Sequence, residues 1–244
     1  MKYGVNNLKR NYSIQCIQRH HLIQFFSFGS KVYSEDLLNL IKNKNYSSFC
    51  ELGAGRGTTT MYLAKYGYSD LTMVDLAEQG FEVAKYSFEK FKLSIPKMII
   101  ADVEKTNIKE ESFDCIYNIG LLEHFDDPRP TLEESYRLLN KVGLIYMPIV
   151  PVQPQYKSFF QRLMFNPLSL IKNIIRSKSK ENNINRTDYP RSFYAKICKE
   201  IGYKNIKCIP YNHIGKLIMM VQLRTNLLFL FINGIIILLK KERL

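Results

Sequence analysis

Three glycines alternate with other residues directly after an apolar run, in residues 51–57 (ELGAGRG). A strand that turns at once into a helix needs backbone angles that glycine adopts most cheaply, and a missing Cβ lets a ligand lie against the main chain. The helix expected from Thr58 would direct free N–H groups and its positive dipole end toward that ligand. We therefore predict that Gly53, Ala54 and Gly55 bind a cofactor. A tight strand–helix turn without a ligand is the alternative.

Two further carboxylates follow the next apolar runs, where strands are expected to end. Asp75 comes 20 residues after Gly55, and it could accept hydrogen bonds from both hydroxyls of a ribose at the carboxyl edge of a parallel sheet. Asp102 ends the following run, where it could accept a hydrogen bond from an adenine amine while Val103 lies against the ring. Taken alone, Asp102 could equally cap the next turn. Together with Glu51, the two aspartates predict a site for a nucleotide-like ligand.

The glycine spacing separates two classes of nucleotide cofactor. Nicotinamide enzymes use G-x-G-x-x-G, in which the third glycine admits a pyrophosphate, whereas this chain has G-x-G-x-G. Glu51, just before the first glycine, would repel a pyrophosphate but would suit a cofactor with a cationic amino-acid end. The sequence thus favours such a cofactor, and a nicotinamide oxidoreductase is a distant alternative.

The elements that would position these residues alternate between residues 46 and 151. The apolar runs show no polar alternation, which is typical of parallel strands covered on both faces. We expect strands at 46–52, 70–75, 97–102, 113–121 and 142–150, and helices at 58–66, 77–91 and 129–140. This order predicts an α/β fold with a doubly wound, Rossmann-like sheet and right-handed crossovers.

The chain divides into four parts around this core. We predict a basic, helical segment at residues 1–44 and the cofactor-binding core at residues 45–151. Residues 152–190 break the rhythm with an apolar stretch and then a basic, Asn-rich one. They predict a helical insertion that covers the substrate at the carboxyl edge of the sheet. Residues 191–244 would complete the fold.

The C-terminal part predicts a helix at 193–201, two strands at 204–210 and 216–223, and an apolar tail helix at 227–239. The tail is too short and too interrupted by polar residues to favour a transmembrane helix. Packing in the core, a contact in a homodimer and binding to a membrane interface are the alternatives for it.

The net charge of +13 is unevenly distributed. Residues 35–151 hold 18 acidic and 13 basic side chains, whereas both flanks are strongly basic. A nucleotide bias in the source genome would explain this, and so would attraction to a phosphorylated substrate, an anionic membrane surface or nucleic acid. No signal peptide is recognisable and the five cysteines show no metal-binding spacing. We expect a cytoplasmic protein with reduced thiols, with association at a membrane as the alternative location.

Residues 118–125 (NIGLLEHF), followed by 126–128 (DDP), complete a set of motifs. With the glycine turn, Asp75 and Asp102, they resemble the class I S-adenosylmethionine-dependent methyltransferases. The closest resemblance is to the group that includes quinone-biosynthesis enzymes and many sugar and natural-product O- and N-methyltransferases. It covers residues 45–151 well and 187–223 loosely. It implies a seven-stranded sheet with the last strand antiparallel, and S-adenosyl-L-methionine as cofactor.

The resemblance also implies roles for matching positions along the cofactor. The methionine end would be held by Glu51 and the turn of Gly53, Ala54 and Gly55, with Asn118 and Ile119 near the same moiety. The ribose would be bound by Asp75 and Leu76. The adenine would be bound by Asp102 and Val103.

His124 is the candidate general base, because its pKa is naturally near neutral and it directly follows the fourth expected strand. A structural hydrogen-bonding role is the alternative. Related enzymes that act on small RNAs bind a metal through a Glu-His pair and further ligands. Gly120 stands where one of those carboxylates would be expected, so we predict no metal.

The acceptor is the least determined part of the prediction. The apolar insertion and tail favour a small-molecule, glycan or lipid-like acceptor that receives a methyl group on oxygen or nitrogen. A nucleic-acid methyltransferase is disfavoured, because no zinc knuckle, RNA-binding module or Asn/Asp-Pro-Pro-Tyr motif is present. A relative that binds the cofactor or a partner without catalysis is the other alternative.

Overall fold

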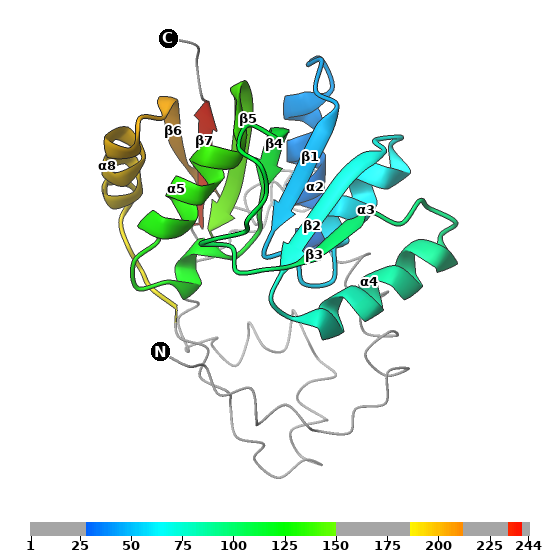
Figure 1. The fold of residues 1–244 in the computed structure, drawn as a ribbon. Helices are drawn as coiled ribbons and strands as arrows, with labels where there is room; N and C mark the ends of the chain where they lie inside the picture. The colour runs from blue at the N-terminus through cyan, green and yellow to red at the C-terminus, as the bar shows by residue number, and fades with distance from the viewer. Residues whose placement is uncertain (1–27, 150–185, 212–233, 241–244) are drawn as a thin grey trace, which may run out of the picture.

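The computed structural model describes residues 28–149, 186–211 and 234–240, which form one layered α/β unit (Figure 1). Its sheet has seven strands in the order β3-β2-β1-β4-β5-β7-β6. The strands are β1 (Ser48–Leu52), β2 (Asp70–Asp75), β3 (Lys97–Ile100), β4 (Phe113–Tyr117), β5 (Leu139–Ile149), β6 (Lys204–Tyr211) and β7 (Gly234–Lys240). Strands β1 to β5 pair in parallel, which confirms the predicted α/β fold. Strand β7 runs antiparallel to β5 and β6.

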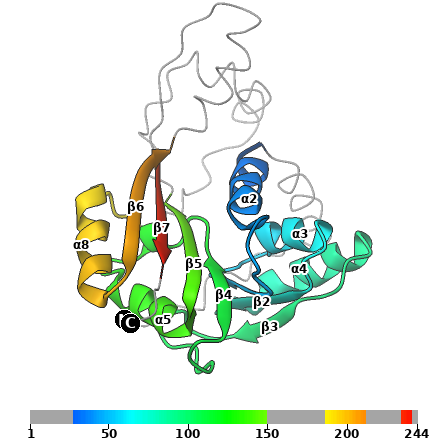
Figure 2. The same cartoon turned by 90° about the horizontal axis from the view of Figure 1, so that it is seen from above.

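Helices cover both faces of this sheet (Figure 2). On one face lie α2 (Phe28–Ile41), α3 (Thr58–Lys65) and α4 (Glu78–Lys90), and on the other α5 (Arg129–Leu138) and α8 (Arg191–Ile201). The core follows this division, because Leu37 of α2 is fully buried with β1 and β4, whereas Leu132 of α5 and Tyr194 of α8 are buried on the opposite side. The central strands are thus covered on both faces, as their continuous apolar runs predicted.

The predicted tail helix at 227–239 is wrong where the structure describes it, because residues 234–240 form β7. Three consecutive β-branched residues, Ile235, Ile236 and Ile237, favour a strand. A short run that is apolar throughout has no period by which to distinguish a buried helix from a buried strand. The predicted strand at 216–223 and residues 152–185 of the predicted insertion lie outside the described residues.

Smaller differences occur at element ends. The helix predicted at 129–140 ends at Leu138, because Leu139 already pairs with Phe113 of β4. The strands predicted to reach residues 102 and 121 end at Ile100 and Tyr117. Asp102 and Asn118 therefore lie in the loops just beyond the carboxyl ends of β3 and β4.

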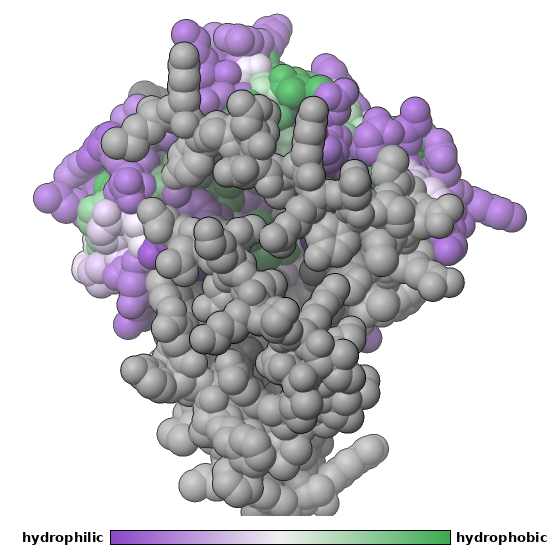
Figure 3. All heavy atoms as spheres, turned by 90° about the horizontal axis from the view of Figure 1, so that it is seen from below, coloured by the Kyte–Doolittle hydropathy of each residue, from purple (hydrophilic) through white to green (hydrophobic). Residues whose placement is uncertain are grey.

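Figure 3 views the molecule from the side toward which the parallel strands run in Figure 1. The described surface that is visible there is largely hydrophilic, with a few hydrophobic patches. Within the described ranges, no helix combines the length and the hydropathy needed to cross a bilayer.

Candidate functional site

The glycine turn after β1 contains three left-handed residues with different neighbours. Gly53, Gly55 and Gly57 have φ angles of 64°, 51° and 63°, which a glycine adopts at least cost. A Cβ on Gly53 would lie 2.6 Å from Leu121 Cδ1, and one on Gly57 would lie 2.5 Å from Met73 Cε. A Cβ on Gly55 would meet nothing within 4 Å. Gly53 and Gly57 therefore allow close packing, while the backbone of Gly55 faces open space where a ligand could lie.

Asp75, at the end of β2, is hydrogen-bonded to the glycine turn. Its Oδ2 accepts the N–H of Gly55 at 2.7 Å, and its Oδ1 accepts the N–H of Ala77 at 2.7 Å. The structure thus places Asp75 directly beside Gly55. Because each carboxylate oxygen has two lone-pair directions, these bonds leave acceptor capacity for ribose hydroxyls. The next residue, Leu76, is a large apolar side chain that is 66% exposed.

Gly80, which the sequence analysis missed, brings helix α4 against the same turn. A Cβ on Gly80 would lie 2.3 Å from the carbonyl oxygen of Gly55. Any residue with a Cβ at position 80 would therefore displace the backbone of the helix or of the turn. An isolated glycine in a helical pattern was the available signal, since it costs helix stability and so suggests a packing reason.

Glu51 lies beneath the turn and is buried. Its Oε2 accepts the N–H of Thr60 at 3.1 Å and the hydroxyl of Thr60, whose oxygen lies 2.9 Å from the hydroxyl of Tyr117. Thr60 belongs to the first turn of α3, so Glu51 satisfies one of the free N–H groups of that helix. Burial raises the pKa of Glu51 to about 7, the bonds from Thr60 lower it, and nearby Asp75 raises it again. Its contact with a cationic cofactor end stays a prediction.

Asp102 and Val103 begin the loop after β3. Asp102 is exposed and its Oδ1 accepts the N–H of Glu104 at 2.9 Å, which is the turn-capping arrangement considered as an alternative. This bond uses one oxygen only, so an adenine contact through the other stays a prediction. Val103 is buried in the core cluster that includes Leu122. Its side chain therefore anchors the loop.

Asn118, just beyond β4, is fully buried. Among the described residues, neither its Oδ1 nor its Nδ2 has a hydrogen-bond partner. A buried amide of this kind points to a ligand or an ordered water, because leaving it unsatisfied is costly. Its neighbour Ile119 is partly buried against the core of the α2 face.

His124 ends a short 3-10 helix, η2 (Leu122–His124), and is partly buried. The described end of the predicted insertion runs beside it. The N–H of Thr187 donates to the carbonyl oxygen of Glu123 at 2.7 Å, and the hydroxyl of Tyr189 donates to that of Asp126 at 2.8 Å. The chain thus returns from the insertion directly onto the loop that carries His124. Within the ranges described, no three His, Cys, Asp or Glu side chains are arranged to hold a metal.

Comparison with known proteins gives the family that this part of the chain resembles. Residues 50–147 match the family model described as "Methyltransferase domain". This match supports the predicted resemblance to the class I S-adenosylmethionine-dependent methyltransferases. S-Adenosyl-L-methionine is accordingly the cofactor to which the glycine turn and the strand ends must be matched.

Two curated methyltransferases illustrate the relationship. A ubiquinone biosynthesis O-methyltransferase from Pelagibacter ubique is 31% identical over 97 residues, which are 40% of this chain and 39% of that protein. The chloroplastic 2-methyl-6-phytyl-1,4-hydroquinone methyltransferase 1 of rice, Oryza sativa subsp. japonica, is 29% identical over 107 residues, or 43% of this chain and 31% of that protein. This chain thus matches well under half the length of either relative.

Among solved structures, phosphoethanolamine N-methyltransferase 2 of Haemonchus contortus, in complex with S-adenosyl-L-methionine, superposes with a TM-score of 0.62. The match covers 87% of this chain and 53% of that protein at 15% identity, so it concerns the fold.

Replacing Gly80 tests the close contact between α4 and the turn. On helix propensity alone, Gly80→Ala would stabilise the protein by roughly 1 kcal/mol. Because the added methyl would overlap the Gly55 carbonyl, we expect instead a loss of about 1–3 kcal/mol in the free energy of unfolding, measured with urea. Gln79→Ala, at an exposed site one residue earlier, is the control. A Gly80→Ala protein as stable as this control would contradict the proposed packing.

The raised pKa of Glu51 predicts a pH-dependent stability. The folded state binds the proton of Glu51 more tightly than the unfolded chain, since its pKa is about 7 instead of 4.5. The stability from this proton is complete below the unfolded pKa and is lost as the pH rises through about 7. The unfolding free energy of wild type minus that of Glu51→Gln should therefore fall between about pH 5 and pH 8. Glu82→Gln, an exposed site, controls for the lost charge, and a pH-independent difference for Glu51→Gln would show the shift to be absent.

Proposed function

We propose that this chain transfers a methyl group from S-adenosylmethionine to an oxygen or nitrogen of a small-molecule, glycan or lipid-like acceptor. The observation that carries the proposal is the set of groups at one edge of the sheet, beyond the ends of β1, β2 and β4. Gly55 offers backbone with open space on the side of its missing Cβ, Asp75 offers carboxylate lone pairs beside it, and Asn118 offers a buried amide.

These groups fit the chemistry of the cofactor. The hydroxyls of a ribose would donate to Asp75, the cationic amino-acid end would lie along the Gly53–Gly55 backbone near Glu51, and Asn118 has both a donor and an acceptor for that polar end. Leu76 and Asp102 follow the ends of adjacent strands β2 and β3, where the nucleoside would extend. When bound, S-adenosylmethionine supplies an electrophilic methyl group on a sulfonium.

The chain's task is then to position the acceptor in line and to manage one proton. If the acceptor is a hydroxyl, His124 in the loop after β4 is suited to receive that proton. The return of residues 186–190 onto this loop supports an acceptor site between the sheet edge and the insertion. The apolar residues of 159–175 and the quinone-pathway names of the two relatives favour a hydrophobic acceptor with a hydroxyl group.

Cofactor binding is the first test. We expect calorimetry to detect S-adenosylhomocysteine binding by the wild-type protein. Asp75→Ala should weaken it by 10- to 100-fold, or about 1.5–3 kcal/mol, because hydrogen bonds to the ribose and to the turn are lost. Asp70→Ala, at the exposed start of the same strand, is the control. A folded wild-type protein that does not bind would refute the proposed function, and an unchanged affinity for Asp75→Ala would exclude only that residue.

Methyl transfer is the second test. The protein is incubated with methyl-labelled S-adenosylmethionine and either a quinol in anionic lipid vesicles or RNA. We expect label in the lipid-soluble fraction. His124→Asn should lower the turnover number by roughly 10²–10⁴-fold, the usual contribution of a general base, while the Kd for S-adenosylhomocysteine stays unchanged. Label in RNA would favour a different acceptor class, and full turnover by His124→Asn would exclude the base role.

A further inference from the structure

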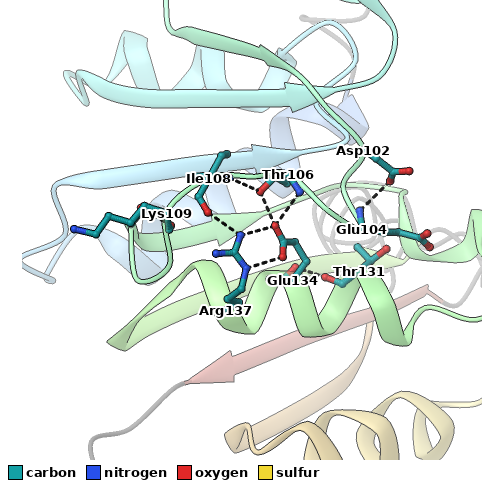
Figure 4. Close-up of polar contacts among 10 residues, drawn as sticks. Asp102, Glu104, Thr106, Ile108, Lys109, Thr131, Glu134 and Arg137 are labelled. Atoms are coloured by element: carbon teal, nitrogen blue, oxygen red, sulfur yellow. Dashed lines mark hydrogen bonds and ion pairs between the residues drawn. The ribbon is translucent and has the colours of Figure 1, made fainter.

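An ion pair from α5, between the buried Glu134 and the partly exposed Arg137, holds the loop that carries Asp102 (Figure 4). Glu134 Oε1 accepts the N–H of Thr106 at 2.9 Å and its hydroxyl at 2.6 Å. Arg137, one turn further along the helix, donates from Nε to Glu134 Oε2 at 2.8 Å and from Nη2 to Glu134 Oε1 at 2.7 Å. The same Nη2 donates to the carbonyl oxygen of Ile108 at 2.7 Å. One pair of side chains therefore fixes the main chain on both sides of Asn107.

The main chain of this loop lacks the regular bonding of a helix or strand, so its buried groups need partners from elsewhere. Asn107 has a φ angle of 57°, a left-handed conformation that asparagine adopts more readily than most residues other than glycine. Thr106 is buried, so the main-chain N–H that it presents must find a partner. Burial raises the pKa of Glu134, but the bonds from Arg137 and Thr106 outweigh it and lower the pKa to about 2. Glu134 is thus held as a carboxylate, and its bonds to the loop are charge-assisted.

A short turn with two hydrogen bonds to Asp102 connects this residue to Thr106. Asp102 Oδ1 accepts the N–H of Glu104, and the carbonyl oxygen of Asp102 accepts the N–H of Lys105 at 3.0 Å. On the other side, the N–H of Ala101 donates to the carbonyl oxygen of Asp75 at 3.2 Å. The main chain is therefore fixed on both sides of Asp102, by strand β2 at Ala101 and by helix α5 at Thr106. A displacement of Thr106 would change the position of the Asp102 side chain.

The Arg137 side chain is 37% exposed, so solvent screens its attraction to Glu134 and the pair contributes only modestly to net stability. Helix α5 is already attached to the sheet by apolar side chains, among them Leu132 and Leu138. What the pair adds is a defined position for the loop, because it bonds to the main chain at Thr106 and Ile108.

We propose that Glu134, held by Arg137, is a positioning residue that acts through Thr106 to aim Asp102 at the nucleobase, and so sets the selectivity of the site for adenine. The inference rests on the proposed function and deepens it. Asp102 would accept a hydrogen bond from the exocyclic amine of adenine. A base with a carbonyl oxygen at that position would face the carboxylate with an acceptor and be repelled.

Two compounds that differ at this edge of the base provide the test. Calorimetry compares S-adenosylhomocysteine with S-inosylhomocysteine, in which a carbonyl replaces the amine and the adjacent ring nitrogen N1 carries a proton. We expect wild type to prefer the adenosyl compound by about tenfold, the scale of one discriminating hydrogen bond. Glu134→Gln should lose most of this preference, mainly by weaker binding of the adenosyl compound. Thr106→Val keeps the main-chain bond to Glu134 and should lose part of it.

Glu133→Gln is the matched control, because Glu133 precedes Glu134 on α5 and is exposed. It should retain the full preference. If Glu134→Gln does not fold, as judged by circular dichroism, Thr106→Val decides the question. A wild type that binds both compounds equally, or variants that keep the wild-type preference, would overturn the inference. A wild type that binds neither compound would instead refute the proposed function.

Discussion

The bond between Asp75 and the N–H of Gly55 joins two strand ends that must act together. It links the turn after β1 to the end of β2, and a second bond from the same carboxylate, to Ala77, leads into α4. A left-handed glycine at position 55 is needed for its N–H to point at the neighbouring strand while its outer side stays open. Gly80 then lets α4 close behind the turn. The shape of the candidate site depends on these few contacts.

The two carboxylates nearest this turn are placed for different tasks. Asp75 lies at the sheet edge, where its oxygens are within reach of a ligand. Glu51 is buried below, bonded to Thr60 at the start of α3, and burial keeps its pKa near neutral. The same turn thus has the carboxylate of Asp75 on its open side and Glu51, whose pKa is about 7, on its inner side. An enzyme that works by positioning its reactants needs a rigid binding site of this kind, because small displacements of the bound reactants lower the reaction rate steeply.

Much of this arrangement could be predicted from the sequence, because it depends on local chemistry. The two-sided apolar runs predicted β1 to β5, and the glycine spacing predicted the turn after β1. The features that could not be predicted depend on contacts between elements that come together only in the folded protein. The need for Gly80 arises only when α4 meets Gly55, and Glu134 meets Thr106 across 28 positions of sequence. The error at 234–240 has another cause, since a uniformly apolar run contains no period to distinguish helix from strand.

Strand β7 has a consequence for the order in which the protein can assemble. It follows β6 in the chain but lies between β5 and β6 in the sheet. During synthesis on a ribosome, β6 and the helix α8 packed against it are made before the strand that attaches them to β5. Until residues 234–240 emerge, β5 presents an unpaired edge, which is a hazard for pairing with other chains. The polypeptide must be made almost to its last described residue before this half of the sheet can close.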